Sequence, residues 1–345
     1  MYKSVVTLER LKEAYAVYNQ VVGKSPRTIQ WYNQKLELFE RFLGDGCELA
    51  DFTLESARAY IADLQNRRAR YERNGYVKDK SGTLSSAYIQ GFARALRAFS
   101  TWLNQEGYTD TNVLQPLKPP RIQRKVIQPL TDEEVGRILG RLKQNDPYAA
   151  RAYAMIWTLL DTGLRASELC GLRVEDMHIE KQGFLKVLGK GNKERLVPIG
   201  TRTMSVLLRW RDVFRPMYDE LDSPYLFLAR EGRSLTTTAL QEVVKRAGRN
   251  SGVPRVHCHL LRHTFATNCL VKEVGDPLRL QQILGHETLE MVRHYVAMAS
   301  VEQSLLERRA SPMDLFAKTM PGRDERARPP ELAGTEANAG AAAPT

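Results

Sequence analysis

The second half of the chain carries six side chains whose types suit chemistry at a phosphate diester. They are two arginines, a lysine, two histidines and a tyrosine: Arg165, Lys190, His259, Arg262, His286 and Tyr295. Cationic groups stabilise the charge that develops on phosphate oxygens during phosphoryl transfer. A tyrosine can attack phosphorus when a base and cations lie beside it. Because no acidic cluster accompanies the set, it favours an anion site over the carboxylate-bound metal of a metal nuclease.

Simpler interpretations exist for single motifs. The turn at 189–193, GKGNK, lies between two β-rich runs, so it lacks the strand–loop–helix context of a P-loop and does not indicate ATP binding. A flexible surface hairpin is the alternative there. His259 and His263 are four residues apart and could share a metal, but Arg262 between them disfavours a cation, and we expect no metal. The spacing of His259 and Arg262 instead suits one phosphate.

Arg165 lies in an otherwise apolar stretch, with residues 156–164 before it and 169–172 after it. A charge embedded there needs a partner or an anionic ligand. Glu168, three residues on, is the nearest candidate to hold the guanidinium in place. In isolation, however, an arginine at a helix start is often only a solvated side chain.

The elements that must position these residues are mostly helical. Helix-spaced apolar residues predict four helices in the first part, at about 7–22, 26–43, 53–64 and 83–107. The runs 183–188 and 194–199 predict a hairpin. Helical patterns then resume at about 201–217, 236–249, 260–274, 277–284, 288–298 and 301–309. The expected fold class is therefore mainly α with a small β-hairpin or sheet (α+β).

The length of 345 residues suggests two domains. A segment with four prolines and several bases, 111–130, breaks helical structure and reads as a linker. We therefore expect a helical domain at 1–110 and a second domain at 131–310. The tail 311–345 is rich in Ala, Pro, Gly and charge, which is typical of disorder.

The formal net charge of +11 favours a polyanionic partner, with nucleic acid first and an anionic membrane second. Four widely spaced cysteines without CxxC exclude a disulfide scaffold and a zinc finger, and fit a reducing cytosol. The sequence contains no run of about 18 apolar residues, so it predicts no membrane-spanning helix. The N-terminus lacks the apolar core of a signal peptide. We expect a cytoplasmic protein.

The order of these motifs resembles the tyrosine recombinase, or phage integrase, family. The matching segments are TGLRASEL around Arg165, GKGNKER around Lys190, HLLRH from His259, LGH ending at His286, and Tyr295 nine residues later. The resemblance is strong over about 130–310 and rests on helical pattern alone over 5–110.

The resemblance implies site-specific DNA strand exchange without ATP, metal or other cofactor. Tyr295 would attack the scissile phosphate, form a 3′-phosphotyrosyl link and free a 5′-hydroxyl. Arg165 and Arg262 would stabilise the pentavalent phosphate. His259 would accept the tyrosine proton or orient the phosphate.

By the same resemblance, Lys190 would protonate the leaving 5′-oxygen, with Lys193 as the rival lysine. His286 would donate a hydrogen bond to a phosphate oxygen, and Glu168 would support Arg165.

The resemblance also implies a helical core-type DNA-binding domain at 1–110 that clamps double-stranded DNA together with the catalytic domain. The basic residues expected to contact DNA phosphates are Arg67, Arg68, Arg70, Arg73, Lys78, Lys80, Arg121, Arg124 and Lys125. A solvated loop is the alternative for 67–80. We expect a homo-tetramer on DNA, with 301–309 docking onto a neighbouring subunit, and a monomer or weak dimer when free. The expected location is the bacterial or archaeal cytoplasm, at the nucleoid.

Two other functions stay open at this stage. One is a DNA-binding protein of the same fold without strand exchange, and the other is type IB topoisomerase-like relaxation of supercoils. Integration or excision, transposon resolution and chromosome-dimer resolution share the same catalytic core. A simple two-domain enzyme of a mobile element, acting on short inverted repeats, is the favoured expectation.

Overall fold

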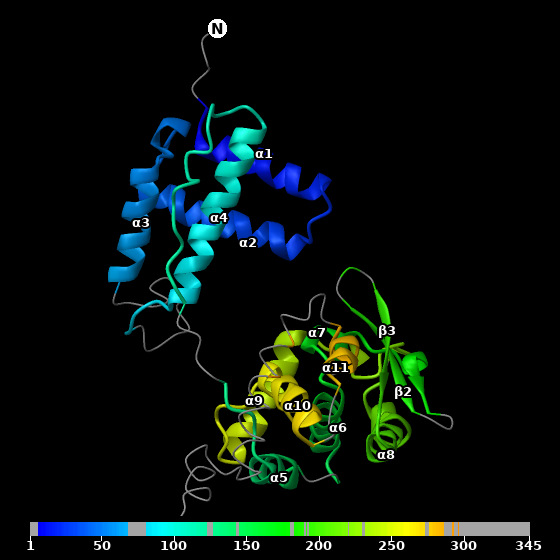
Figure 1. The fold of residues 1–345 in the computed structure, drawn as a ribbon. Helices are drawn as coiled ribbons and strands as arrows, with labels where there is room; N and C mark the ends of the chain where they lie inside the picture. Colours follow the sequence, from blue (N-terminus) through cyan, green and yellow to red (C-terminus); the bar gives the residue numbers. More distant parts are fainter. Residues whose placement is uncertain are drawn as a thin grey trace, which may run out of the picture. The chain divides into compact units, whose positions relative to one another are not determined.

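The computed structural model divides into two compact units, Met1–Val126 and Ile127–Thr345, shown in Figure 1. The division lies inside the segment 111–130 that the sequence predicts as a linker. The residues that the structure describes are 6–67, 81–122, 127–142, 145–179, 183–189, 191, 193–219, 221–229, 232–272, 276–285, 292 and 296.

The first unit is helical, with a short 3₁₀ turn at Leu49–Asp51. Its helices are α1 (Leu8–Val21), α2 (Pro26–Leu43), α3 (Leu54–Asn66) and α4 (Ser86–Gln105). Local sequence sets their starts: the Ser25 side chain accepts the Thr28 N–H, and Pro26 takes the first helical position. Thr53 caps α3 in the same way. Helix α2 ends at Gly44, which has φ +112°.

Aromatic side chains fill the core of the first unit. The Tyr15 ring lies edge-on to Phe99, with centroids 5.3 Å apart, and Trp102 packs against both. The chain after α4 joins the same core, because Leu114 and Leu117 are buried there. The first part of segment 111–130 therefore packs on the first unit.

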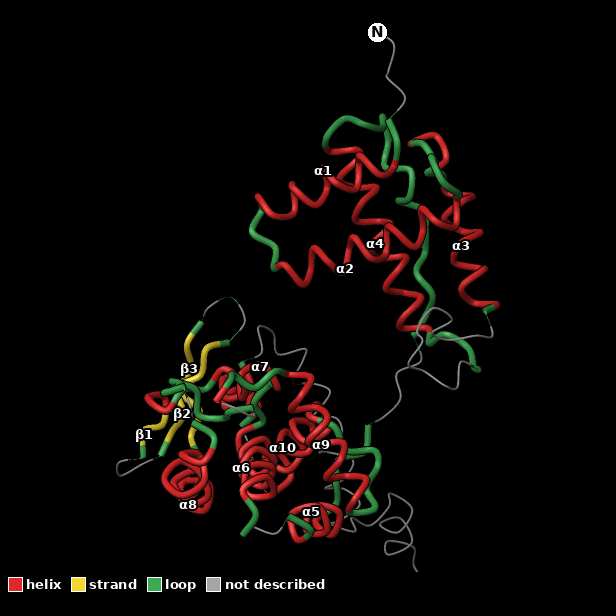
Figure 2. Tube along the Cα trace, turned by 180° about the vertical axis from the view of Figure 1, so that it is seen from behind, coloured by secondary structure: helices red, strands yellow, loops and turns green. Residues whose placement is uncertain are grey.

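The second unit combines helices with a three-stranded antiparallel sheet of order β1-β2-β3, drawn in yellow in Figure 2. The strands are β1 (Met177–His178), β2 (Phe184–Leu188) and β3 (Glu194–Pro198). The helices are α5 (Asp132–Gly140), α6 (Pro147–Thr162), α7 (Ala166–Gly171), α8 (Thr201–Arg209), α9 (Thr237–Asn250), α10 (Cys258–Lys272) and α11 (Pro277–Leu284).

Helix α6 forms the centre of this unit and packs along α10. It ends at Gly163, which has a left-handed φ of +61°. A Cβ at Gly163 would lie 2.3 Å from the Phe265 ring on α10 and 2.8 Å from Leu284 on α11. Glycine thus lets the end of α6 approach α10 and α11 closely, directly before Arg165.

The predicted fold class, mainly helical with a small sheet, is confirmed. The predicted hairpin is β2–β3, in register from Phe184 opposite Pro198 to Leu188 opposite Glu194, and β1 adds a third strand. The predicted helix at 201–217 begins as α8 and continues as a π-helical turn and a 3₁₀ turn. The predicted helix at 301–309 and the tail lie outside the described residues, as does most of 288–298.

Within the part of the chain that the structure describes, none of the helices has the length and apolar character needed to cross a membrane.

Candidate active site

Arg165 stands at the N-terminus of α7, immediately after the close approach at Gly163. Its backbone N–H donates to Glu168 Oε2 over 2.8 Å, and its Nη1 donates to Glu168 Oε1 over 2.8 Å. The third contact runs from Nη2 to the carbonyl oxygen of Gly285, 3.1 Å away. One third of the Arg165 side chain stays exposed, so the guanidinium is held in place and can still meet a ligand.

Arg262 lies on α10 and is buried. Its Nη1 donates to the Gly163 carbonyl over 2.6 Å, and its Nη2 donates to the Leu284 carbonyl over 2.9 Å. The same side chain therefore ties the end of α6 to the end of α11. Both ends lie next to the contacts of Arg165, so α10 and α7 present their arginines to one region.

His259 lies one turn before Arg262 on α10. Partial burial is the main cause that lowers its pKa, and the positive charge of Arg262 lowers it further. An imidazole with a lowered pKa is neutral at physiological pH and can accept a proton.

Arg195 joins this region from β3, although sequence reasoning did not select it. Its Nη1 and Nη2 donate to the two oxygens of Glu168 over 3.0 and 2.8 Å. Its Nε donates to the Ile283 carbonyl over 2.8 Å. The available signal was strand alternation, because Arg195 shares a strand face with the buried Val197. An arginine at such a position must find buried partners.

Glu168 lies between Arg165 and Arg195 as the negative centre of this arginine cluster, and its side chain is only 3% exposed. Burial alone raises the pKa of a carboxyl group, but hydrogen bonds from Arg195 and Arg165 outweigh that effect. The pKa of Glu168 therefore lies below its ordinary value, and the carboxylate stays charged.

Three arginines thus donate to three consecutive carbonyls at the C-terminal end of α11. Arg195 binds the carbonyl of Ile283, Arg262 that of Leu284, and Arg165 that of Gly285. The last carbonyls of a helix lack intrahelical partners and carry partial negative charge, so guanidinium groups suit them.

A groove of about 580 Å³ opens beside His259, between α9 and the loop before α10. Its lining includes Lys245, Arg249, Arg255 and His257. Arg249 and Arg255 also form ion pairs with glutamates. The groove is basic and suits a polyanion.

Three of the six predicted catalytic residues, Lys190, His286 and Tyr295, lie outside the described residues. The ends of the hairpin turn are described: the Gly189 N–H donates to the Lys193 carbonyl over 2.8 Å. Val292, which precedes Tyr295 by three residues, is buried in a cluster with Leu284 of α11 and residues of α10.

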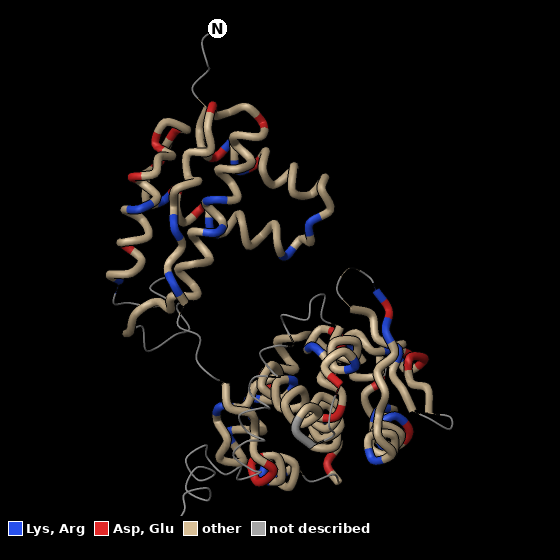
Figure 3. Tube along the Cα trace, viewed as in Figure 1, with Lys and Arg blue, Asp and Glu red and all other residues tan. Residues whose placement is uncertain are grey.

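Of the residues predicted to contact DNA phosphates, two are described. Arg67 ends α3 and donates to Asp63 over 2.8 Å, and Arg121 is exposed. The others, namely Arg68, Arg70, Arg73, Lys78, Lys80, Arg124 and Lys125, lie outside the described residues. Figure 3 shows that Lys and Arg positions occur in both units, interleaved with Asp and Glu.

Among the residues that the structure describes, no three His, Cys, Asp or Glu side chains form a group that could hold a metal ion. His263, weighed above as a metal partner of His259, is buried, and its Nε2 lies 2.8 Å from the Ile127 carbonyl oxygen.

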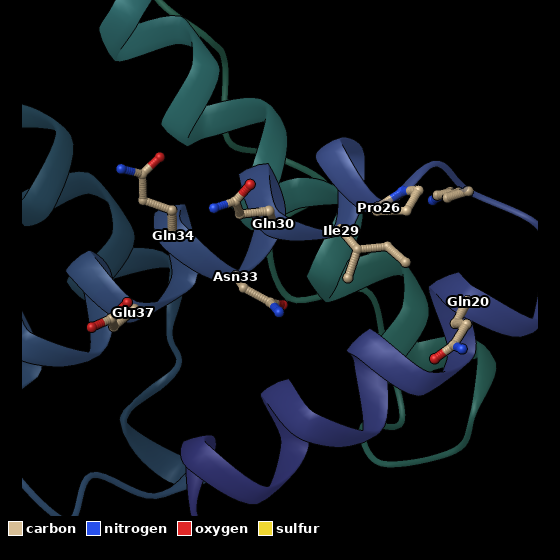
Figure 4. Close-up of a pocket in the computed structure, with 8 residues that line it drawn as sticks. Gln20, Pro26, Ile29, Gln30, Asn33, Gln34 and Glu37 are labelled. Carbon is tan, nitrogen blue, oxygen red and sulfur yellow. The ribbon is translucent and has the colours of Figure 1, made fainter. Parts of the chain in front are cut away.

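A second groove, of about 630 Å³, lies in the first unit between α1 and α2. Figure 4 shows Gln20 of α1 on one side and Ile29, Asn33 and Glu37 of α2 on the other. Half of the eight lining side chains are uncharged and polar, and none of the eight belongs to the predicted catalytic set.

Comparisons with known proteins identify the family of the chain. The model of the phage integrase family matches residues 128–301. Tyrosine recombinase XerC of Serratia marcescens is 31% identical over 296 residues, covering 84% of this chain and 90% of that protein. Tyrosine recombinase XerC of Oceanobacillus iheyensis is 32% identical over 298 residues, covering 84% and 91%.

Solved structures share the fold. The XerH recombinase bound to its palindromic difH substrate matches with a TM-score of 0.64 at 21% identity, covering 82% of this chain and 79% of that chain. A lambda integrase tetramer bound to a Holliday junction matches with a TM-score of 0.63 at 18% identity, covering 85% and 78%.

Proposed function

The chain belongs to the phage integrase family of tyrosine recombinases, and on that premise we propose that it cuts and rejoins DNA at specific sites through a 3′-phosphotyrosyl intermediate. The observation that carries the proposal is that Arg165 and Arg262 converge on the end of α11, while His259, one turn before Arg262, feels the charge of both arginines and lines a basic groove. The carboxylate nearest to them, Glu168, is already occupied by two arginines. The site can therefore accept an anion.

The first half of the reaction exchanges one phosphate ester for another. The Tyr295 oxygen attacks the scissile phosphorus, and the bond from phosphorus to the 5′-oxygen breaks. His259 accepts the tyrosine proton, which its lowered pKa permits. Lys190 supplies a proton to the leaving 5′-oxygen, and His286 donates to a phosphate oxygen.

The arginines supply electrostatic stabilisation. Arg165 and Arg262 are fixed by carbonyl and carboxylate partners before the substrate arrives, so little reorganisation is needed when charge develops on the phosphate. The phosphotyrosyl bond conserves the energy of the diester. A 5′-hydroxyl of the partner strand then attacks it and releases Tyr295, with no ATP consumed.

The assembly follows from the same premise. The solved XerH complex is described with its DNA substrate, and the lambda integrase as a tetramer on a Holliday junction. We extend both features to this chain: its partner is double-stranded DNA, and four copies act together in the cytoplasm of a bacterium or archaeon. The first unit, Met1–Val126, then serves as a DNA-binding domain.

A nicked suicide duplex tests the proposal, with the binding site selected from the DNA that flanks the gene. The nick lets a short 5′-hydroxyl fragment diffuse away after cleavage, so a covalent protein–DNA adduct accumulates on a denaturing gel. We expect the adduct with the wild-type protein and its loss in Tyr295→Phe, with DNA binding kept.

The alternatives give other results. DNA binding at the selected site without any adduct indicates a binding protein. Relaxation of plasmids that lack the site indicates a topoisomerase.

A further inference from the structure

We propose that Arg195 is a positioning residue of the recombination reaction, which holds Arg165 through Glu168 and supports the backbone at Gly189 and Gly285. The inference rests on the proposed function, and it concerns a residue outside the predicted catalytic set. It stands on three hydrogen bonds of Arg195 and two close backbone approaches.

The hydrogen bonds of Arg195 connect three separate elements. The guanidinium belongs to β3, it binds both oxygens of Glu168 on α7, and its Nε binds the Ile283 carbonyl on α11. Because Glu168 also binds Arg165, one planar group controls the support of that catalytic arginine.

The two backbone approaches concern the residues that directly precede Lys190 and His286. A Cβ at Gly189 would lie 3.1 Å from Arg195 Nη1 and 3.3 Å from the Lys193 carbonyl oxygen, and a Cβ at Gly285 would lie 3.2 Å from Cζ, Nε and Nη1 of Arg195. Such distances are tighter than ordinary van der Waals contact, so a side chain at either position would push the guanidinium. At Gly189 no left-handed φ is present, and the close approach is what favours glycine there.

Both members of the central ion pair are shielded from water, with 13% of the Arg195 side chain and 3% of the Glu168 side chain exposed. In such surroundings a charged contact is stronger than on the surface. Without Arg195, the whole charge of Glu168 would act on Arg165 and draw it away from the phosphate. The backbones at Gly189 and Gly285 would lose their common neighbour as well.

The two variants Arg195→Lys and Arg195→Gln separate charge from shape. Lysine keeps the charge but cannot bind Glu168 with two parallel donors and Ile283 with a third. If Arg195 acts by geometry, neither variant rescues the reaction. We expect single-turnover cleavage to fall by about 100-fold in both, the order of effect for a misplacement of about 1 Å, with DNA affinity within threefold of wild type.

Arg215 supplies a matched control in the same unit. It is buried like Arg195, it pairs with the Asp219 carboxylate over 2.7 Å, and it donates to the carbonyls of Ser223 and Tyr225. Its partners all lie in 219–225, and none of them is Arg165, Glu168, Arg195 or Arg262. After correction for the folded fraction by circular dichroism, Arg215→Gln should cleave within threefold of wild type.

A substrate with sulfur in place of the bridging 5′-oxygen separates positioning from folding. A variant that is only misfolded should lose the same fraction of its cleavage rate on the oxygen and sulfur substrates. A thiolate leaves without a proton, so a misplaced or missing Lys190 matters less. We expect Lys190→Ala to recover on sulfur, and the defect of Arg195→Gln to shrink from about 100-fold to about 10-fold. The remaining defect reflects Arg165 and His286.

Wild-type cleavage by Arg195→Gln, full rescue by Arg195→Lys, or an equal defect on oxygen and sulfur substrates would overturn the inference. Failure of the proposed function looks different, because the wild-type protein itself would then form no adduct. If Arg195→Gln does not fold, Gly189→Ala crowds the guanidinium and keeps the test. Gly189→Ala should slow cleavage by about 10-fold. Gly136→Ala, which has open space around it, should cleave at the wild-type rate, and equal cleavage rates for the two variants would refute the inference.

Discussion

Replacing Glu168 by glutamine probes the centre of the arginine cluster with almost no change of shape. Each carboxylate oxygen accepts two hydrogen bonds. Oε1 takes Nη1 of Arg165 and Nη1 of Arg195, while Oε2 takes the Arg165 backbone N–H and Nη2 of Arg195. In glutamine, an NH₂ group replaces one of these oxygens, so a hydrogen-bond donor would stand where two N–H donors now find an acceptor. The neutral side chain would also leave both guanidinium charges without a counter-charge.

The expected loss of unfolding free energy is large for a single atom exchange. Breaking a buried ion pair by neutralising one partner costs about 3–5 kcal/mol, and the Glu168 side chain is 3% exposed. For a unit of this size, that corresponds to a fall in melting temperature of roughly 10 °C. Urea unfolding at pH 7, followed by tryptophan fluorescence, measures the difference directly.

The pH dependence supplies the second half of this test. The pKa of Glu168 is below its ordinary value in the folded protein, so its contribution is fully present above the unfolded pKa of about 4.3. It is lost as pH falls through the lower folded pKa, because the unfolded state binds the proton first. The stability difference between wild type and Glu168→Gln should therefore shrink only below about pH 4.

Glu242 provides the comparison, because it forms an ion pair with Arg249 at the exposed surface. Glu242→Gln should leave the melting temperature unchanged, as surface pairs contribute little. The reasoning about Glu168 is wrong if Glu168→Gln unfolds within about 1 kcal/mol of wild type, or if the difference does not change with pH.

Two further substitutions test the packing of each unit. Gly163→Ala should lower the unfolding free energy by about 2–4 kcal/mol, because the new Cβ meets the Phe265 ring in a left-handed backbone. It should also slow cleavage, because it shifts the carbonyl that Arg262 binds. Gly140→Ala, which has open space around it, is the control in urea unfolding and in the suicide-substrate assay, and equal behaviour of the two variants would contradict the clash. Lys35→Met should stabilise the first unit by about 2 kcal/mol at pH 7, because burial lowers the pKa of Lys35 to about 8 even with its ammonium 3.7 Å from the Tyr88 ring centroid. The lysine of the unfolded chain binds its proton more tightly, so the gain in stability should fade as pH rises from 8 to 10. A gain that is constant with pH would refute the lowered pKa of Lys35.

The sequence predicted those features that depend on neighbours along the chain. Ser25 and Thr53 mark helix starts through side chains that accept nearby N–H groups, and the β2–β3 hairpin follows from two β-rich runs around a glycine turn. The contact of Glu168 with Arg165 spans only three residues. The resemblance to tyrosine recombinases, drawn from motif order, is confirmed by the family match and by the relatives.

The partners of Arg165 and Arg262 at the end of α11 could not be predicted, because they are distant in sequence. Arg262 reaches the carbonyls of Gly163 and Leu284, which are 99 and 22 residues away. Carbonyl oxygens are present at every residue, so no residue type marks the ones that will accept a guanidinium. Only the close packing of α6, α10 and α11 selects them.

Arg195 shows why a motif can contain a functional residue without revealing it. It follows the GKGNK turn by two positions, and strand alternation can place it on the face of the buried Val197 but cannot name its partners. Its partners, Glu168 and Ile283, are 27 and 88 residues away, and the glycines that make room for it lie in two different motifs. Those glycines read as turn residues in the sequence, yet in the structure both lie against one guanidinium. The two motifs therefore depend on each other through the backbone space that they leave for Arg195, and a substitution at either glycine should disturb the same arginine.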